Sequence, residues 1–257
     1  MSDITRWARW LTGLGVRREG ALLVHASLRG TGLRAGQVRD ALLRALGPAG
    51  VLVVPAFTPE NSDTSHAHQA RTEGLTEREK EGFRASMPPF EPDTTGCPSM
   101  GALAECVRTT PGAVRSAHPQ TSFAGLGREA AGLLAGHDPH CHLGERSPLA
   151  RLYAVDAQVL LLRVGFEVCS AFHLAEYRLT PPPPRRTYRC VVAERGHWIS
   201  YEDIALDDSD FTRVGEGLPR ELLAQRRWAG KSVVLFPMRA AVDTARVRMT
   251  GYRHGLT

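Results

Sequence analysis

The sequence contains no long apolar run. None of its stretches approaches the ~18 consecutive apolar residues that a membrane-spanning helix needs. Residues 1–7 also lack the continuous apolar segment of a secretory signal. These absences predict a cytoplasmic protein with no membrane partner. The 42% hydrophobic and 23% charged residues are typical of a globular chain with a sizeable core.

Lysine is scarce. Lys80 and Lys231 are the only lysines among 32 basic residues, and with 27 acidic residues the formal net charge is +5. A basic balance favours a nucleic-acid partner. The arginines, however, are dispersed in runs no longer than two and do not alternate with aromatic residues, as a nucleic-acid platform would require. We therefore expect no nucleic-acid partner.

Paired cysteine motifs are absent. The five cysteines include no C-x-x-C, which argues against a zinc ribbon and a disulfide framework and predicts reduced, mostly buried thiols. Residues 137–142 (HDPHCH) carry possible zinc ligands, but ligands at three successive positions would point in different directions. We interpret this segment, and also His66 and His68, as polar surface loop, and we expect no metal.

Three common catalytic fingerprints are missing as well. The chain has no G-x-S-x-G elbow, no G-x-x-x-x-G-K-[ST] loop and no G-x-G-x-x-G after a strand. These absences argue against the usual hydrolases, nucleoside triphosphatases and dinucleotide-binding enzymes.

Short apolar runs alternate with amphipathic segments. Buried strands are predicted at 21–24, 51–54 and 159–162, with further strands at 188–192 and 232–236. Helices are predicted at 3–13, 37–46, 100–109, 127–135 and 171–177, the last begun by a Ser170 cap, and 181–184 should be a polyproline segment. This order is typical of crossover units of a parallel sheet, whose strand ends usually carry sites. Residues 59–98 form a long polar loop of the kind that often has a function.

Five dispersed motifs together resemble a known family. They are H-x-S-L at 25–28, P-A-F-T at 55–58, R-S-x-H-P-x-x-S at 115–122, G-E-R-S-P-L at 144–149 and H-x-A-E at 173–176. In this order they resemble the aminoglycoside 3-N-acetyltransferases, acetyl-CoA-dependent antibiotic-resistance enzymes. The likeness covers nearly the whole chain and ends at Leu235–Asp243. It implies one antibiotic acetyltransferase-like domain over 1–257, with a three-layer α/β/α fold, a mostly parallel central sheet and long inserted loops.

The resemblance implies acetyl transfer to the 3-amino group of an aminoglycoside. An ammonium group has no lone pair, so a general base must first remove a proton. His173 fits this role because imidazole titrates near neutrality. Glu176 lies at i+3 on the same helical face and can orient the ring, with Glu145 as the competing partner. We expect direct transfer in a ternary complex, with Thr58 as a possible hydrogen-bond donor to the oxyanion.

The family's CoA site maps onto two segments. The first is His25, Ala26, Ser27 and Leu28, which follow a strand and precede a helix. The second is Arg115, Ser116 and Ser122, in which an arginine suits the CoA phosphates. Ser27 could equally be a simple helix cap.

A polycationic acceptor requires a locally acidic site in a basic protein. Two groups of residues are candidates for substrate binding. One is Glu60, Asn61 and Asp63; the other is Asp203, Asp207, Asp208 and Asp210, which with Glu202 place five acids within nine residues. A solvated surface is the other reading of such a run. If these acids lie far from His173, a different acceptor is favoured.

Two alternatives remain open. One is an acyl-CoA-dependent N-acyltransferase of the same fold that acts on another amine, such as a biosynthetic intermediate or a non-aminoglycoside antibiotic. The other is a non-catalytic protein that binds CoA or nucleic acid. The sequence does not give the oligomeric state.

Overall fold

The structure is a computed structural model that describes residues 3–192, 194 and 196–254. Its helices are α1 (Asp3–Leu14), α2 (Ala35–Leu46), α3 (His66–Thr72), α4 (Glu77–Ser86), α5 (Ala102–Arg108), α6 (Ala130–Leu134), α7 (Pro148–Ala154), α8 (Ala171–Tyr177), α9 (Phe211–Glu216) and α10 (Met238–His254). Short 3-10 helices are η1 (Pro59–Asn61), η2 (Pro98–Met100), η3 (Phe166–Val168) and η4 (Arg220–Leu222). None of the described helices is both long and apolar enough to cross a membrane.

Seven strands form the central sheet, in the order β3-β4-β2-β1-β5-β9-β8. They are β1 (Ala21–Ala26), β2 (Val51–Pro55), β3 (Val114–Arg115), β4 (Phe123–Leu126), β5 (Gln158–Leu162), β8 (Ala224–Trp228) and β9 (Lys231–Pro237). Strands β2, β1 and β5 pair in parallel at the centre, and the outer pairs are antiparallel. Most strands nevertheless run in the same direction, namely β1, β2, β3, β5 and β8, whereas β4 and β9 run in the opposite direction. The expected α/β class with a mostly parallel sheet is therefore confirmed.

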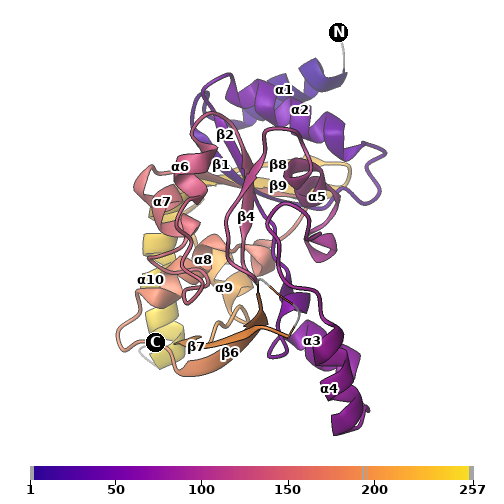
Figure 1. Cartoon of the computed structure of the whole chain (residues 1–257). Coiled ribbons are helices and arrows are strands. Elements are labelled where there is room, and N and C mark those ends of the chain that lie inside the picture. The colour runs from indigo at the N-terminus through magenta and orange to yellow at the C-terminus, as the bar shows by residue number, and fades with distance from the viewer. Residues whose placement is uncertain (1–2, 193, 195, 255–257) are drawn as a thin grey trace.

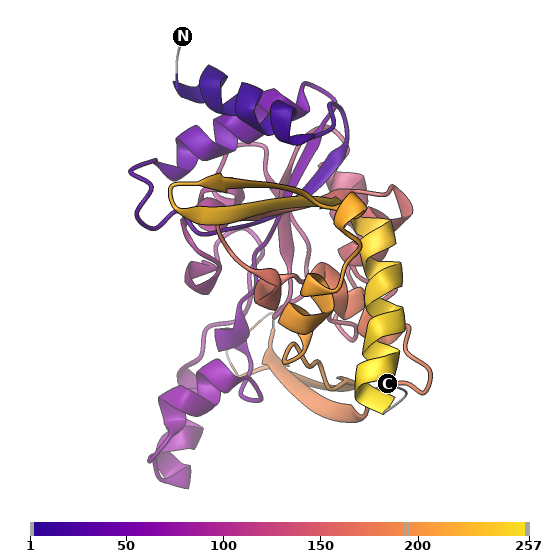
Figure 2. The ribbon, with the colours of Figure 1, turned by 180° about the vertical axis from the view of Figure 1, so that it is seen from behind.

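The apolar runs form strands because both faces of the sheet are covered. Leu22 and Val24 pack under α1, α2 and α5, whereas Leu23 packs against α6 to α10 on the opposite face. Successive side chains of a strand point to opposite faces, so a strand buried on both sides is apolar at every position. Figure 1 and Figure 2 show these two helical layers on either side of the sheet.

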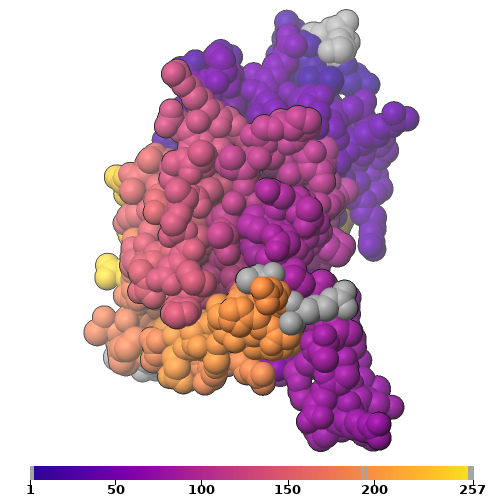
Figure 3. All heavy atoms as spheres, in the orientation of Figure 1, coloured from indigo at the N-terminus to yellow at the C-terminus, as the bar shows by residue number. Residues whose placement is uncertain are grey.

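Two parts of the chain extend beyond the layers. Strands β6 (Arg185–Val191) and β7 (Trp198–Ile204) form a separate antiparallel pair. Helices α3 and α4 project from the body as an arm, which Figure 3 shows at the lower right. The segment 59–98 was expected to be a loop but contains both helices. Each begins at a side-chain cap, Ser65 and Thr76.

The cysteines are free, as expected, and four of the five are buried. The expectation of a polar surface loop at 137–142 is wrong. His137 and His142 are 4% and 2% exposed, while His140 is exposed. His142 Nδ1 lies 2.9 Å from Asp203 Oδ2, and His137 Nε2 lies 2.8 Å from the carbonyl oxygen of His142. Hydrogen-bond partners within the protein therefore satisfy these rings in the interior.

Candidate active site

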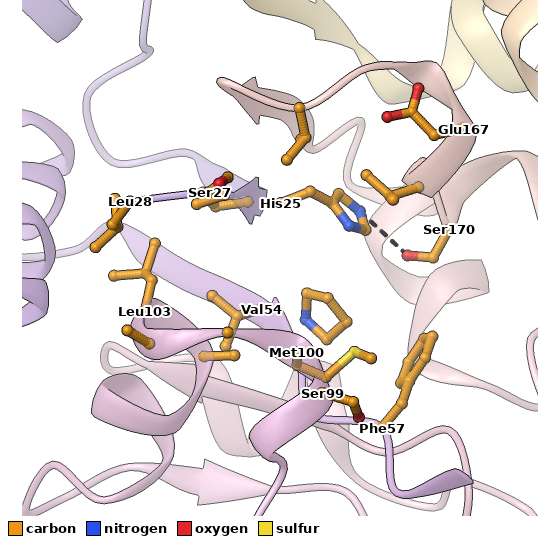
Figure 4. Close-up of a pocket in the computed structure, with 18 of the residues that line it drawn as sticks. His25, Ser27, Leu28, Val54, Phe57, Ser99, Met100, Leu103, Glu167 and Ser170 are labelled. Atoms are coloured by element: carbon orange, nitrogen blue, oxygen red, sulfur yellow. Dashed lines mark hydrogen bonds between the residues drawn. The ribbon is translucent and has the colours of Figure 1, made fainter. Parts of the chain in front are cut away.

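A cavity of about 720 Å³ opens where β1 and β2 end. Its walls come from the loop after β1, from η2 and the start of α5, and from η3, α8 and α9 (Figure 4). Most of the lining side chains are apolar, among them Val54, Phe57 and Phe211. Its volume lies within the ~300–1,000 Å³ typical of small-molecule pockets.

His173 forms part of the wall of this cavity. Its side chain is 13% exposed, and Nδ1 is hydrogen-bonded to Oε2 of Glu176, one helical turn further along α8. This bond leaves Nε2 as the ring nitrogen able to take up a proton. A histidine oriented by a carboxylate at the edge of a cavity has the geometry of a general base.

Glu176 is fixed by further contacts. The side chain is fully buried, and Oε1 accepts hydrogen bonds from Arg253 Nη1 at 2.7 Å and from the backbone N–H of Asp207 at 3.0 Å. Arg253 also pairs with Asp210. Glu145, the competing partner, instead forms an ion pair with Arg178, 2.6 Å away. The structure therefore joins His173 to Glu176 and not to Glu145.

A second histidine lies on the same cavity. His25 is 5% exposed, and its Nε2 lies 3.2 Å from the hydroxyl of Ser170 (Figure 4). Burial, and then the charge of nearby His173, lower the pKa of His25 to about 3. Its imidazole is therefore neutral near pH 7.

The first predicted CoA segment lies at the cavity and the second does not. His25, Ala26, Ser27 and Leu28 all line the cavity. Arg115, Ser116 and Ser122 do not line the cavity. Their side chains form hydrogen bonds within the protein instead. Ser116 Oγ lies 3.0 Å from His137 Nδ1, and Ser122 donates to the carbonyl of Ala56 at 2.8 Å.

Most of the guanidinium donors of Arg115 are engaged within the fold. Its nitrogens donate to the carbonyls of Ala56, Pro92 and Thr95 and to the hydroxyl of Ser122. Burial lowers the pKa of its guanidinium to about 10. These contacts favour a structural role for Arg115, and its expected contact with CoA phosphates stays a prediction. Sequence reasoning missed Arg29, the only arginine among the described residues lining the cavity. Its position two residues after Ser27 was the available signal.

Thr58 is also removed from its expected place. It is 1% exposed and outside the cavity lining, and its hydroxyl donates to the carbonyl oxygen of Pro119 at 2.7 Å. A hydroxyl has one proton to donate, so Thr58 offers none to an oxyanion in this structure. These contacts argue against the expected oxyanion role of Thr58, which stays a prediction.

The predicted acidic residues at 203–210 do not all lie at the site. Asp208 lines the cavity, and Asp207 and Asp210 contact the Glu176–Arg253 pair. Asp203 is instead buried, where it accepts from His142 and Tyr177.

The acidic group at 60–63 lies outside the cavity lining. Asn61 donates to the carbonyl of Pro88, and Asp63 pairs with Arg189 at 3.0 Å. The expected part of Glu60, Asn61 and Asp63 in acceptor binding stays a prediction. Glu167, which sequence reasoning missed, lines the cavity, as Figure 4 shows.

Fold and site together define a class. An α/β sheet carries, at its strand ends, a cavity with a carboxylate-oriented histidine, and such a site can take a proton from a bound substrate. The chain belongs to the aminoglycoside 3-N-acetyltransferase family, whose sequence profile matches residues 23–250. The resemblance drawn from the motifs is therefore confirmed, and the relatives in this family are acetyltransferases by name.

Individual relatives are similar to this chain over most of their length. The SPbeta prophage-derived aminoglycoside N(3')-acetyltransferase-like protein YokD of Bacillus subtilis is 31% identical over 244 residues, covering 91% of this chain and 88% of the relative. Its crystal structure matches with a TM-score of 0.89 over 98% of this chain and 94% of that one.

Two further relatives are similar. Aminoglycoside N(3)-acetyltransferase III of Pseudomonas aeruginosa is 32% identical over 219 residues, covering 82% of this chain and 78% of the relative. The structure of AAC-VIa bound to sisomicin matches with a TM-score of 0.80 and 26% identity over 98% of each chain.

Proposed function

We propose that this protein transfers the acetyl group of acetyl-CoA to an amine of an aminoglycoside, with the 3-amino group as the position that the family implies. The observation that carries the proposal is the His173–Glu176 pair at the wall of the cavity. Family membership supplies the class of reaction, and this pair supplies the base that the reaction needs.

The proposed chemistry is direct transfer within a ternary complex. Acetyl-CoA supplies an acetyl group activated as a thioester. His173 Nε2 takes a proton from the acceptor ammonium, so that the nitrogen lone pair attacks the thioester carbonyl carbon. Glu176 holds the ring through Nδ1 and stabilises the imidazolium that forms. As the carbon–sulfur bond breaks, His173 returns this proton to the sulfur, and the acylated nitrogen releases its second proton to water.

The residues around the cavity suit a long, partly apolar cosubstrate. Leu28 and Leu103 offer apolar surface to a pantetheine arm, and Ser27 offers a hydroxyl. Arg29 is exposed at the cavity lining, where a guanidinium can meet a phosphate. We assign this side to CoA.

Two carboxylates suit a cationic acceptor. Glu167 and Asp208 line the cavity together with His173. In the part of the chain that the structure describes, neither takes part in an ion pair. Their charges are therefore available to ammonium groups. The sisomicin complex of AAC-VIa supports an aminoglycoside as the first acceptor to test.

A second candidate is acyl transfer to a different amine. It is favoured by the small number of acids at the cavity, because Asp63, Asp203 and Asp210 are engaged elsewhere. An acceptor with one or two ammonium groups would need no more than Glu167 and Asp208.

Turnover across a panel of amines tests both candidates. Free thiol released from acetyl-CoA is measured with sisomicin, other aminoglycosides and amines of unrelated structure. We expect the highest kcat/KM among aminoglycosides. Turnover restricted to other amines would select the second candidate, and the absence of both turnover and saturable acetyl-CoA binding would contradict an enzyme of this class.

The His173→Ala variant tests the assigned base. Loss of a general base should lower kcat by about 100- to 10,000-fold, while calorimetry should still detect acetyl-CoA binding. His66→Ala, which removes an exposed histidine on α3, is the matched control. Near-normal turnover by His173→Ala would remove the residue from this role.

A further inference from the structure

Ser170 stands at the N-terminus of α8, but its hydroxyl does not cap this helix. The side chain is turned instead toward His25, with Oγ 3.2 Å from Nε2. Both residues are buried and both line the cavity (Figure 4). A buried serine that leaves its helix uncapped needs another explanation for its orientation.

The fold brings this pair to the reacting end of the cavity. His25 lies near the end of β1, opposite Leu161 of the neighbouring strand β5. The chain leaves β5 and passes through η3 into α8. Ser170 and His173 are three residues apart and line the same cavity, so the hydroxyl and the proposed base lie on one side of the helix.

The Ser170–His25 pair lacks the basic imidazole that activates a serine nucleophile. An activated serine needs a basic imidazole, usually oriented by a carboxylate. The pKa of His25, lowered to about 3 by burial and by His173, makes this ring a weak base. Among the described residues, its only hydrogen-bond partner shown is Ser170. A neutral imidazole can nevertheless donate one hydrogen bond.

We propose that Ser170 is the hydrogen-bond donor to the carbonyl oxygen of the acyl group and that His25 is its positioning residue. In this arrangement Nε2–H of His25 donates to Oγ of Ser170, which turns the serine proton toward the cavity. The inference rests on the proposed acetyl transfer and replaces Thr58, whose proton is engaged by Pro119.

The electron balance of the step shows where this donor acts. When the amine nitrogen attacks the carbonyl carbon, the carbon–oxygen π electrons move to the oxygen. Ser170 stabilises that negative charge by a hydrogen bond and keeps its own proton. When the electrons return, the carbon–sulfur bond breaks and the thiolate leaves. One amine proton passes through His173 to the sulfur, and the nitrogen releases a second proton to water as the amide forms.

Removal of the hydroxyl tests the donor directly. Ser170→Ala should lower kcat by about 100- to 1,000-fold, as is usual for one oxyanion donor, with little change in the KM for acetyl-CoA. Ser170→Thr retains a hydroxyl and should recover most of the activity. Ser86→Ala is the matched control, because Ser86 is exposed on α4 and lies outside the cavity lining. Its kcat should stay near wild type.

A spectroscopic signature separates a donor from a merely structural serine. The carbonyl stretch of enzyme-bound acetyl-CoA labelled with carbon-13 at the carbonyl is measured by infrared difference spectroscopy. A hydrogen bond weakens the carbonyl bond, so the wild type should absorb at lower frequency than Ser170→Ala. Circular dichroism and thermal unfolding establish that each variant is folded.

The role of His25 is tested through its coupling to Ser170. His25→Ala should lower kcat and shift the carbonyl stretch in the same direction as Ser170→Ala. His25→Gln, whose amide can donate from a similar position, should restore part of both. Because the two residues act as a unit, the double variant should be no slower than Ser170→Ala alone.

Three outcomes would overturn the inference. They are near-wild-type kcat in Ser170→Ala, an unchanged carbonyl stretch, and a stable acetyl adduct on Ser170 detected by mass spectrometry. The last would make Ser170 a nucleophile. If the wild type binds acetyl-CoA but acetylates no amine, the proposed function fails while the carbonyl stretch still decides the inference.

Discussion

At the scale of single residues, the structure separates side chains that the sequence leaves equivalent. Glu145 and Glu176 are both plausible partners of His173 by motif. Glu176 is fully buried and contacts His173 and Arg253, whereas the Glu145 side chain is 56% exposed and pairs with Arg178. A buried carboxylate with fixed donors holds a ring in one orientation better than a solvated one does.

Glu176→Gln should therefore impair His173 as a general base while leaving its imidazole in place. The amide keeps the shape but loses the charge that stabilises an imidazolium and fixes the Nδ1–H tautomer. We expect kcat to fall by about 100-fold or more, measured by thiol release at saturating acetyl-CoA. Glu145→Gln serves as the control and should remain near wild type. Equal losses in the two variants would contradict this assignment.

Arg29 and Arg115 should likewise give opposite phenotypes. Arg29→Ala should raise the KM for acetyl-CoA about tenfold while leaving stability unchanged, because one exposed phosphate contact is lost. With S-acetyl-N-acetylcysteamine, a thioester without phosphates, the variant and wild type should be alike. An equal effect on both thioesters would exclude a phosphate contact.

Arg115→Ala should act on stability. It leaves the carbonyls of Pro92 and Thr95 without their donor and the carbonyl of Ala56 with Ser122 alone. Because a buried polar group left unpaired costs about 1–3 kcal/mol, the free energy of unfolding should fall by at least that amount. Urea unfolding followed by circular dichroism measures it, with Arg29→Ala as the control.

At the scale of elements, helix α4 is distinguished by its lack of core contacts. None of its residues is buried, and Figure 3 shows the α3–α4 arm projecting from the body. Its stability depends on local terms such as the Thr76–Glu79 capping box. Local terms of this kind are readable from sequence.

Gly82→Ala should therefore stabilise α4 alone. Gly82 is inside the helix, and an added Cβ would meet nothing within 4 Å. Alanine favours a helix over glycine by about 0.5–1 kcal/mol, so amide exchange in α4 should slow several-fold with no change in global unfolding.

Gly127→Ala is the contrasting control. Gly127 has a φ of +126°, and a Cβ there would collide with the carbonyl oxygen of Gly50. Strain and overpacking should lower the free energy of unfolding by about 2 kcal/mol or more. A rise in global stability with Gly82→Ala would indicate that the arm is coupled to the core.

At the scale of the whole molecule, several histidines are buried in neutral form. Burial lowers the pKa of His25 to about 3 and that of His137 to about 4, and it holds the pKa of His118 well below its usual range. The His118 ring centroid lies 4.7 Å from that of His137 and 6.2 Å from that of Tyr201 on β7.

Acid should therefore unfold the protein early. In the unfolded chain these histidines titrate near ~6.5. Their stabilising effect is complete above that pH and is lost as the pH falls toward their lowered folded values. Between pH 6.5 and 5, each should reduce the free energy of unfolding by up to about 2 kcal/mol. Urea unfolding at several pH values measures the slope.

Two variants identify the source of that slope. His25→Gln removes one buried titrating group and should make the pH dependence shallower. His66→Gln removes an exposed histidine and should leave it unchanged. A stability that is flat from pH 6.5 to 5 in the wild type would contradict the assignment.

Features that depend on local pattern can be predicted from the order of residues along the chain. Continuous apolar runs specified β1, β2 and β5, and helical periodicity specified α1, α2 and α8. The i, i+3 spacing placed Glu176 within reach of His173, and the motif order gave the family. Each depends on neighbours along the chain, so each is visible without coordinates.

Only the tertiary structure decided which polar groups face the cavity. Arg115 and Thr58 lie in motifs of the family, yet each donates a hydrogen bond to a distant carbonyl, that of Ala56 and that of Pro119 respectively. Ser170 meets His25 across 145 positions of sequence. A side chain turns inward or toward a cavity according to the partners that packing brings near, and the residue type alone does not contain that information.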